Sequence, residues 1–413
     1  MSFSACLAQH PITWGLSIFL AGVWLSRVVL VGLNLDKIPE ISGPDYDGFP
    51  LNSSGCVPRV SIVVPARNEQ DHIEAGLRSL LELDYPDYEV IAIDDRSDDK
   101  TGAVMDLLSE SRRSQGASSC SRLQVLHIKD LPAGWLGKTH AMWRGGQLAT
   151  GDWILFTDAD VVFRADALRR AIVQAERERA DHFVLFPTMV MKSAGERMMI
   201  AFFQSQFVFA RLPWKVSNPK SKDAIGVGAF NLIRREVYER IGTYERMRLE
   251  ILDDMRLGEI VKHEGFRQRV AFGRGLLRLR WVFGAYGMVR NLAKNGFAIL
   301  RFNVWFALLA VCGILLVNVG PYVGVMLAPG WSRLGFGAGL AALVMVYTGM
   351  SWHSDVPPYY VLLHPIAALV FCYALVRSAV LTVVNDGVDW RDTHYSLGEL
   401  RAFLREQPRW TWP

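Results

Sequence analysis

Long apolar runs stand near both ends of the chain, one close to the start and three close to the end. The first, from Pro11 to Leu35, is almost wholly apolar over about the 20 residues that span a bilayer. Its single charge is Arg27, and no basic start or small-residue cleavage site accompanies it. The pattern therefore predicts a retained membrane helix rather than a removed signal peptide.

Three further apolar runs predict three more membrane helices. They cover Phe302 to Ala328, Leu334 to Met350 and Tyr359 to Val384. The middle run contains GFGAG and is short and weakly apolar. A re-entrant or interfacial segment is therefore the alternative for this run.

Between these runs, apolar and polar segments alternate as in a soluble α/β domain. Short β-branched runs predict buried strands at 59–65, 88–93, 123–128 and 153–157. Helical spacing predicts helices over 69–83, capped by Asn68, and over 101–109. This order predicts a mostly parallel sheet with helices on both faces, in which ligands bind at the carboxyl ends of the strands.

The pattern divides the chain into a membrane anchor (1–36), an α/β domain (57–301), a membrane region (302–384) and a basic tail (385–413). Basic residues crowd the end of the α/β domain, so the positive-inside rule places this domain in the cytoplasm. The tail is basic as well, with Arg391, Arg401, Arg405 and Arg409. Three membrane crossings after a cytoplasmic domain would place the tail outside the cell. Either the weakly apolar run 334–350 therefore does not cross, or the tail departs from the positive-inside rule.

Composition points to a membrane protein with reduced thiols. The 413 residues are 51% hydrophobic and 21% charged, with a mean hydropathy of +0.16, which is too apolar for an ordinary soluble enzyme. A net charge of +4 is too balanced for a nucleic-acid binder. The cysteines, Cys6, Cys56, Cys120, Cys312 and Cys372, have neither disulfide-framework nor zinc spacing.

Pairs of acids follow the predicted strands. Asp158 and Asp160 come just beyond the fourth strand, and two carboxylates suit a hard Mg²⁺ or Mn²⁺ ion shared with phosphate oxygens. A solvated turn is the ordinary alternative for them. Asp94 and Asp95 end the second strand and taken alone favour a turn.

A third acidic pair and a lysine complete the candidate chemistry. Asp253 and Asp254 precede a predicted helix, where they act as cap or dipole partner, or one of them as a general base. Lys138 lies in a glycine-rich stretch and is either a surface lysine or a cation for a diphosphate. The glycines of residues 226–228 form a flexible junction that admits a ligand.

Taken in order, VVPARNE, IDDRSDD, GWLGK, FTDAD, GVGAFN and DDMRLG closely resemble the family-2 glycosyltransferases, nucleotide-sugar enzymes of the GT-A fold. The resemblance spans residues 57–281. The flanking helices are similar to those of the membrane-bound, lipid-glycosylating branch that includes ceramide glucosyltransferase and hopanoid- or carotenoid-associated transferases. It implies inverting transfer of a sugar, with a UDP-sugar as the expected donor, to a membrane lipid hydroxyl, with Mg²⁺ or Mn²⁺ bound.

The resemblance also implies roles for single residues. The nucleotide pocket would be lined by Pro65, Ala66, Arg67 and Glu69, and the base would be contacted by Asp94 or Asp95. The metal would be held by Asp158 and Asp160, with Asp160 the expected direct ligand. The second acid of the 253–254 pair, Asp254, is the expected catalytic base. Burial or the neighbouring Asp253 is expected to raise its pKa.

The family's Gln-x-x-Arg-Trp element is present only as Leu277 to Trp281, with leucine in place of glutamine. This difference counts against a processive polysaccharide synthase and leaves open the roles of Arg280 and Trp281. A non-enzymatic scaffold would have no use for acids at successive strand ends. The aromatic segment 202–214 is expected either in the membrane interface or in a core helix.

The implied partners are a nucleotide sugar, a lipid acceptor and the bilayer, with no nucleic acid. The expected location is a bacterial inner membrane with the catalytic domain in the cytoplasm. The sequence leaves open the donor base and sugar, the exact lipid and the oligomeric state.

Overall fold

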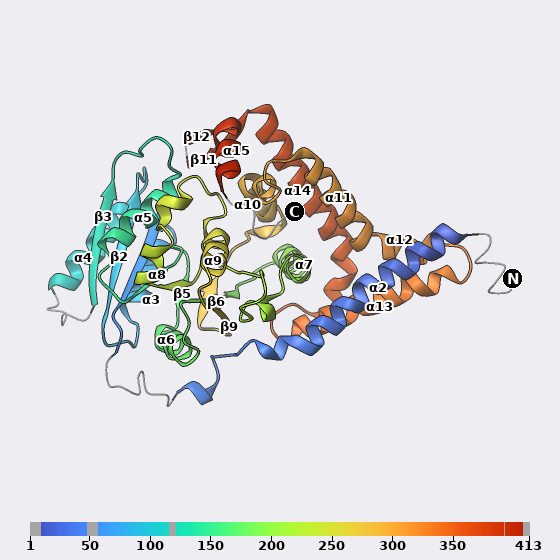
Figure 1. Cartoon of the computed structure of the whole chain (residues 1–413), viewed down its shortest axis with the longest axis horizontal. Helices are drawn as coiled ribbons and strands as arrows, with labels where there is room; N and C mark the ends of the chain where they lie inside the picture. The colour runs from blue at the N-terminus through green and yellow to red at the C-terminus, as the bar shows by residue number, and fades with distance from the viewer. Residues whose placement is uncertain (1–9, 48–56, 115–120, 392, 408–413) are drawn as a thin grey trace. The chain divides into compact units, whose positions relative to one another are not determined.

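The computed structural model describes residues 10–47, 57–114, 121–391 and 393–407, which group into two compact units (Figure 1). The sheet unit comprises Ile38–Val190, Leu212–Arg280 and Phe403–Pro413. The helical unit comprises Met1–Lys37, Met191–Arg211 and Trp281–Ala402. The chain therefore passes repeatedly between the two units, and residues 191–211 and 281–301 group with the apolar helices.

The sheet unit is built on a seven-stranded, mostly parallel sheet, as the sequence predicts. Its strands are β1 (Val60–Ala66), β2 (Tyr88–Asp95), β3 (Ser121–Ile128), β4 (Trp153–Phe156), β6 (His182–Phe186), β8 (Asn231–Arg234) and β9 (Gln268–Phe272). Their order is β3-β2-β1-β4-β8-β6-β9. Only β8 runs antiparallel to its neighbours, β4 and β6. The four predicted strands correspond to β1 through β4, and each observed strand end lies within two residues of the predicted one.

Strand β1 lies in the middle of the parallel part and is buried along its whole length. Its continuous apolar run fits a strand whose two faces are both covered. Pro65 lies near its end, beyond the last residue paired with β4, which is Val63. A proline is tolerated there because no β4 ladder bond needs its missing N–H.

Helices and a small second sheet complete this unit. The helices are α3 (Ile73–Leu81), α4 (Thr101–Ser114), α5 (Gly137–Leu148), α6 (Ala167–Arg177), α8 (Arg235–Arg240) and α9 (Asp253–His263), with 3₁₀ turns at Pro44–Tyr46, Pro213–Lys215 and Tyr244–Met247. The small sheet consists of β5 (Val162–Phe163), β10 (Leu277–Leu279) and β7 (Thr188–Met189). A core that includes Val63, Ile91, Phe156, Tyr244 and Leu257 packs side chains of β1, β2, β4 and α9 together.

The predicted cap of the first helix is wrong. Helix α3 begins at Ile73, and its N-cap position is His72. Asn68 has a positive φ of 53°, and its Oδ1 accepts a bond of 2.9 Å from the N–H of Asp98. Because an asparagine tolerates the left-handed region, Asn68 turns the chain instead of starting the helix.

The helical unit contains α2 (Pro11–Asn34), α7 (Ala194–Ala210), α10 (Gly284–Ile299), α11 (Val304–Asn318), α12 (Gly320–Leu327), α13 (Ser332–Ser351) and α14 (His364–Val384). Short 3₁₀ turns follow α2 (Leu35–Lys37) and precede α14 (Pro358–Leu363). A hairpin of β11 (Gly387–Trp390) and β12 (Thr393–Ser396) leads to α15 (Leu397–Glu406), where the chain returns to the sheet unit.

Within the described residues, three helices are long and apolar enough to cross a membrane: Pro11–Lys37, Ser332–Ser351 and Pro358–Val384. A fourth span exists if α11 and α12, which are bent by 48°, count as one. The irregular run is therefore 302–328, whereas the sequence suggested 334–350. Pro321 in the first turn of α12 explains the break, because proline has no N–H to continue α11.

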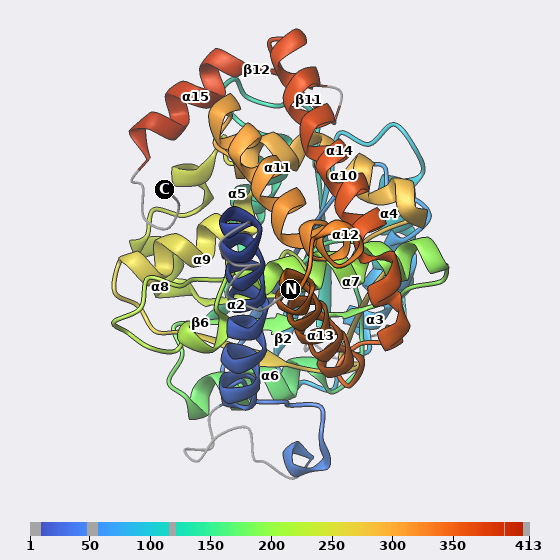
Figure 2. The same cartoon turned by 90° about the vertical axis from the view of Figure 1, so that its right-hand side faces the viewer.

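Helices α2 and α13 lie side by side and run in the same direction (Figure 1, Figure 2). A Cβ at Gly335 would lie 2.6 Å from Ser17 Oγ, and one at Gly339 would lie 3.6 Å from Ala21 Cα. The first of these distances is too short for any side chain, so Gly335 permits the close approach of the two helices.

The aromatic run 202–214 begins in α7, which ends at Ala210. Phe202 is fully buried, and its ring packs against those of His364 at 5.1 Å and Phe371 at 5.3 Å between centroids. This face of α7 therefore packs inside the helical unit, as expected for a core helix rather than for a segment in the membrane interface.

Two of the cysteines, Cys312 and Cys372, are free thiols. Cys6, Cys56 and Cys120 lie outside the described residues, as does Arg409 of the basic tail.

Candidate active site

The acidic pairs predicted from the sequence lie at the carboxyl ends of neighbouring strands. Ala66 of β1 pairs in register with Asp94 of β2, and Val63 pairs with Phe156 of β4. Asp158 follows β4 by two residues. Asp94, Asp95 and Asp158 therefore share one edge of the sheet, which is where ligands bind in parallel α/β folds.

The loops that follow β1 and β2 are bonded to each other. The backbone N–H groups of Asn68, Glu69 and Gln70 donate to Ser97 Oγ (3.1 Å), Thr101 Oγ1 (2.8 Å) and Asp99 Oδ2 (3.1 Å). Arg67 is nearly buried, and its guanidinium lies 4.0 Å from Asp98. These bonds hold the segment 65–69, the expected nucleotide pocket, in one conformation.

The two aspartates expected at the base already have protein partners. Asp94 accepts from the N–H of Ser97 at 3.2 Å and bonds His127 Nδ1 at 2.9 Å. Asp95 is fully buried and forms an ion pair with Arg96 at 2.9 Å. The hydrogen bond that His127 makes to the Asp94 carboxylate raises the pKa of His127 against the effect of burial, with help from Asp106. The sequence analysis did not identify His127 or Arg96; Arg96 directly follows β2, and His127 is the penultimate residue of the neighbouring strand β3.

Helix α5 begins directly beside Asp95. A Cβ on Gly137 would lie 2.4 Å from Asp95 Oδ2, so only glycine fits the first position of this helix. The close approach fixes where the next residue, Lys138, starts.

Lys138 joins two of the acidic pairs. Its Nζ lies 2.9 Å from Asp158 Oδ1 and 3.4 Å from Asp253 Oδ1. Burial alone would lower the pKa of Lys138, but Asp158, Asp253 and Asp254 together raise it well above its usual value. Lys138 is therefore a largely buried lysine paired with two acids rather than the surface lysine of the default interpretation.

The loop of residues 226–228, which contains Gly226 and Gly228, packs closely against Asp158 and Asp254. A Cβ on Gly228 would lie 2.5 Å from Asp158 Oδ2, and one on Gly226 would lie 1.7 Å from the carbonyl oxygen of Asp254. The N–H of Gly228 donates to Asp254 Oδ2 at 2.8 Å, and its carbonyl accepts from the N–H of Asp158 at 3.1 Å. This loop therefore sets the position of Asp254 relative to Asp158.

Asp254 lies in the first turn of α9 as a half-buried carboxylate. Its Oδ1 accepts from the N–H of Met255 at 2.7 Å. Burial and the like charge of Asp253 raise the pKa of Asp254 to about 6, against the lowering effect of Lys138. A carboxylate has about four acceptor sites, so the two backbone bonds leave Asp254 able to accept a further proton.

Asp158 and Asp160 are the expected metal ligands. Burial, and after it the nearby charges of Asp158 and Glu69, raises the pKa of Asp160 to about 7. No cluster of three or more His, Cys, Asp or Glu with metal geometry occurs within the described part of the chain. Two carboxylates suit Mg²⁺ or Mn²⁺ when ligand phosphates and water complete the shell.

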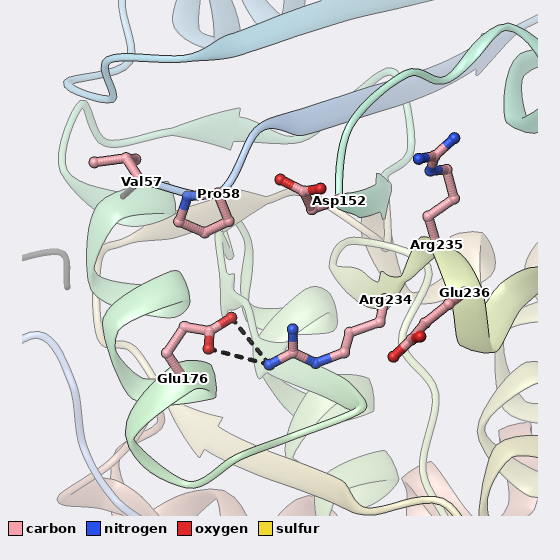
Figure 3. A pocket seen from close by; sticks show the side chains of 7 residues that line it. All are labelled: Val57, Pro58, Asp152, Glu176, Arg234, Arg235 and Glu236. Carbon is pink, nitrogen blue, oxygen red and sulfur yellow. Dashed lines mark hydrogen bonds and ion pairs between the residues drawn. The ribbon is translucent and has the colours of Figure 1, made fainter. Parts of the chain in front are cut away.

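A separate pocket of about 490 Å³ lies at the opposite edge of the sheet (Figure 3). It is lined by Val57, Pro58, Asp152, Glu176, Arg234, Arg235 and Glu236. Arg234 forms two bonds to Glu176, at 3.0 and 3.1 Å. Pro58 and Asp152 precede β1 and β4, so this pocket is at the amino ends of the strands and contains none of the expected site residues.

The remnant of the Gln-x-x-Arg-Trp element divides between the units. Leu277 is fully buried in β10, where it pairs with Phe163, so the leucine fills core space. Arg280 ends the sheet-unit segment, and Trp281 begins the helical-unit segment. The Trp281 ring packs on that of Phe203 at 4.7 Å, which is a structural contact within the helical unit.

Residues 61–242 match the profile of the family described as Glycosyl transferase family 2. A beta-monoglucosyldiacylglycerol synthase of Trichormus variabilis is 31% identical over 179 residues, which cover 43% of this chain and 34% of that protein. A 4,4'-diaponeurosporenoate glycosyltransferase of Staphylococcus aureus is 27% identical over 217 residues, covering 50% of this chain and 54% of that protein. The chain therefore spans about a third to a half of the length of these curated relatives.

Among solved structures, the mannosyltransferase PcManGT from Pyrobaculum calidifontis, in complex with GDP-Man and Mn²⁺, is similar with a TM-score of 0.51 and 17% identity. The similarity covers 91% of this chain and 99% of that one. It concerns the fold, and it confirms the expected GT-A architecture with its mostly parallel sheet.

Proposed function

We propose that this chain, which carries a glycosyl transferase family 2 domain over residues 61–242, transfers one sugar from a nucleotide sugar to a hydroxyl group of a membrane lipid. The observation that carries the proposal is the meeting of Lys138, Asp158, Asp253 and Asp254 at the carboxyl edge of the sheet. Such a site offers a cation for phosphate, ligands for a metal and a carboxylate base within one buried cluster.

Asp254 is the proposed general base. The proton of the acceptor hydroxyl passes to its carboxylate while the acceptor oxygen bonds the anomeric carbon. The bond from that carbon to the diphosphate breaks, and its electron pair leaves with the nucleoside diphosphate, so the configuration inverts. A pKa of about 6 suits this role, because general bases work best when their pKa lies near the working pH.

Lys138, Asp158 and Asp160 form the proposed diphosphate end of the site. The buried ammonium of Lys138 faces Asp158 at 2.9 Å and would orient the leaving diphosphate. A Mg²⁺ or Mn²⁺ ion held by Asp158 and Asp160 would supply charge neutralisation for the departing group. Residues 65–69, with Asp94 and Asp95, form the proposed pocket for the nucleoside, with a UDP-sugar as the proposed donor.

A lipid acceptor is proposed for two reasons. Three helices of the chain are long and apolar enough to cross a membrane. The relatives named above carry lipid and carotenoid acceptors in their names. The proposed setting is a cytoplasmic membrane surface with the sheet unit on the cytoplasmic side, consistent with the basic residues before α11.

Substitution of single carboxylates tests these assignments. Asp254→Asn removes the base but keeps its shape, so turnover should fall by at least about 10³-fold while the Kd for the donor changes little. Asp160→Ala should instead weaken metal-dependent donor binding, measured by titrating Mn²⁺ and UDP-sugar calorimetrically.

Asp166→Asn is the control, because this aspartate pairs with Arg164 and Arg170 rather than with Lys138. A normal turnover rate for Asp254→Asn would remove the base assignment. An unchanged metal titration for Asp160→Ala would remove the metal assignment.

A further inference from the structure

Three buried polar side chains of the sheet unit contact the loop of residues 225–228. They are His182 of β6, Gln268 of β9 and Asn231 of β8, and each is at most 1% exposed. His182 and Gln268 are paired in register on neighbouring parallel strands. A buried polar side chain destabilises the fold unless it is hydrogen-bonded, so the partners of these three side chains show what they hold in place.

Gln268 bonds both backbone groups of Ile225, the first residue of this loop. Its Oε1 accepts from the N–H of Ile225 at 3.1 Å, and its Nε2 donates to the carbonyl of Ile225 at 2.8 Å. The same Nε2 lies 3.4 Å from the carbonyl oxygen of Gly258 in α9. A Cβ on Gly258 would lie 2.3 Å from the Ile225 carbonyl oxygen, so α9 packs directly on the loop. Gln268 therefore fastens the loop where α9 contacts it.

His182 and Asn231 extend these bonds to the middle of the loop. Gln268 Nε2 donates to His182 Nδ1 at 2.7 Å. The imidazole proton is therefore on Nε2, which donates to Asn231 Oδ1 at 3.2 Å. Asn231 Oδ1 also accepts from the N–H of Val227 at 3.4 Å. Burial lowers the pKa of His182 to about 4, so the ring stays neutral at neutral pH and keeps this arrangement of donors and acceptors.

The next residue of the loop, Gly228, contacts two of the acids of the candidate site. Its N–H donates to Asp254 Oδ2 at 2.8 Å, and its carbonyl accepts from the N–H of Asp158 at 3.1 Å. A displaced loop would therefore carry the Asp254 carboxylate with it or lose the bond to this carboxylate. A displacement of about 1 Å at a reacting group can lower a rate by about 100-fold.

We propose that Gln268, with His182 and Asn231, is a positioning residue that acts through the loop 225–228 to hold Asp254 in place for proton transfer. The inference rests on the proposed function and adds to it residues that lie behind the loop. Stability alone does not call for this cluster, because apolar side chains of the same shape can replace a buried hydrogen-bonded pair at little cost. What hydrocarbon cannot supply is the set of bonds that fixes the loop backbone.

Hydrogen exchange of the full-length protein in nanodiscs tests the first step of this proposal. Gln268→Met keeps the length of the side chain and removes its hydrogen bonds. We expect the peptide that covers residues 225–230 to exchange about tenfold faster in this variant than in the wild type. Gln174→Met is the matched control, because Gln174 of α6 is 3% exposed and accepts from Tyr46 Oη at 2.9 Å. It should leave the exchange of this peptide unchanged.

Unchanged exchange of residues 225–230 in Gln268→Met, or an equal increase in Gln174→Met, would overturn the proposal. Because neither donor nor acceptor is present in this experiment, its outcome is independent of whether the protein transfers sugar.

The transfer assay, scaled to the amount of folded protein, tests the second step. Gln268→Met should lower kcat by about 10- to 100-fold. The KM for the nucleotide sugar should change by less than about threefold, because the Asp158 carboxylate is held by Lys138. His182→Leu should lower kcat in the same way, whereas His182→Gln, which keeps one donor and one acceptor, should restore most of it. A wild-type kcat for Gln268→Met, or equal values for the two His182 variants, would overturn the positioning role.

Discussion

At the scale of single residues, buried charges in the sheet unit are held by several partners each. Lys138 has three acidic neighbours, and Glu89 of β2 accepts from Ser61 Oγ at 2.6 Å and Thr150 Oγ1 at 2.7 Å. Glu89 thereby ties β1 and β2 to the turn that precedes β4. Burial alone would raise the pKa of Glu89, but the bonds from Ser61 and Thr150 and the charge of Arg59 lower it overall.

The lowered pKa of Glu89 makes stability depend on pH. A carboxylate whose pKa is lower in the folded state stabilises the fold above its usual pKa near 4.5, and this contribution is lost as the pH falls through the folded value. Glu89→Gln should lower the free energy of unfolding by about 1–3 kcal/mol at pH 7. The difference from wild type should shrink below about pH 4.5.

Thermal unfolding in detergent at pH 7 and pH 4 measures this effect. Glu74→Gln is the control, because Glu74 is exposed on α3 and pairs only with Arg78, four residues later. A constant difference between wild type and Glu89→Gln across this pH range would contradict the argument.

At the scale of elements, the loop 226–228 is the part of the site most sensitive to added volume. Gly228→Ala places a methyl group 2.5 Å from Asp158 Oδ2, so the loop or Asp158 must move. We expect a loss of about 1–3 kcal/mol in donor binding and turnover combined, with the fold retained. The measurement is kcat/KM for the nucleotide sugar.

Gly43→Ala serves as the control for the loop variant, because a Cβ there meets nothing within 4 Å. If Gly228→Ala kept the wild-type kcat/KM, the loop would not position Asp158 and Asp254 as described.

The sequence predicted strands well where the pattern of apolar residues alone determines the secondary structure. Strands β1 to β4 and the acids at their ends follow from continuous apolar runs ended by polar residues. The start of α3 was wrong because Asn68 bonds Asp98, thirty residues away in the chain, and local patterns do not contain such a partner. Gly137 and Gly228 are likewise explained only by side chains that the fold brings against them.

At the scale of the whole molecule, packing in the helical unit indicates the direction of each apolar segment. Trp24 Nε1 donates to the carbonyl of Val317 at 2.9 Å, and Leu20 packs with Ala328. The bent pair α11–α12 therefore runs toward the N-terminal end of α2. Helix α13 then runs back in the direction of α2 and ends near Gly32.

Helix α14 returns to the side from which α11 starts. Its first residue, His364, lies beside Trp24 at half the length of α2, with 5.7 Å between ring centroids. Further along, Ser378 Oγ donates to the carbonyl of Ala293 in α10, the helix before α11. Gln407 bonds Arg246 and Arg256 of the sheet unit. The end of the tail, from Phe403, therefore belongs to the sheet unit, and α14 is part of a candidate span.

The positive-inside rule predicts that the basic tail lies on the cytoplasmic side of the membrane. This prediction is testable with cysteines in intact cells. Trp331→Cys, in the exposed turn before α13, should react with a membrane-impermeant maleimide from outside. Glu399→Cys in α15 should react only after lysis. The wild-type protein gives the background from its own thiols. Labelling of Glu399→Cys in intact cells would show that the tail is external and that α14 crosses.

The proposed role of Asp254 and its cluster is the transfer of a single sugar to a membrane lipid. In the most direct measurement, the full-length protein in nanodiscs is incubated with radiolabelled UDP-sugars, and the lipid extract is analysed by mass spectrometry. We expect a lipid bearing one sugar, formed by the wild type and absent with Asp254→Asn. Label in a long polymer, or the same lipid product from Asp254→Asn, would contradict the claim.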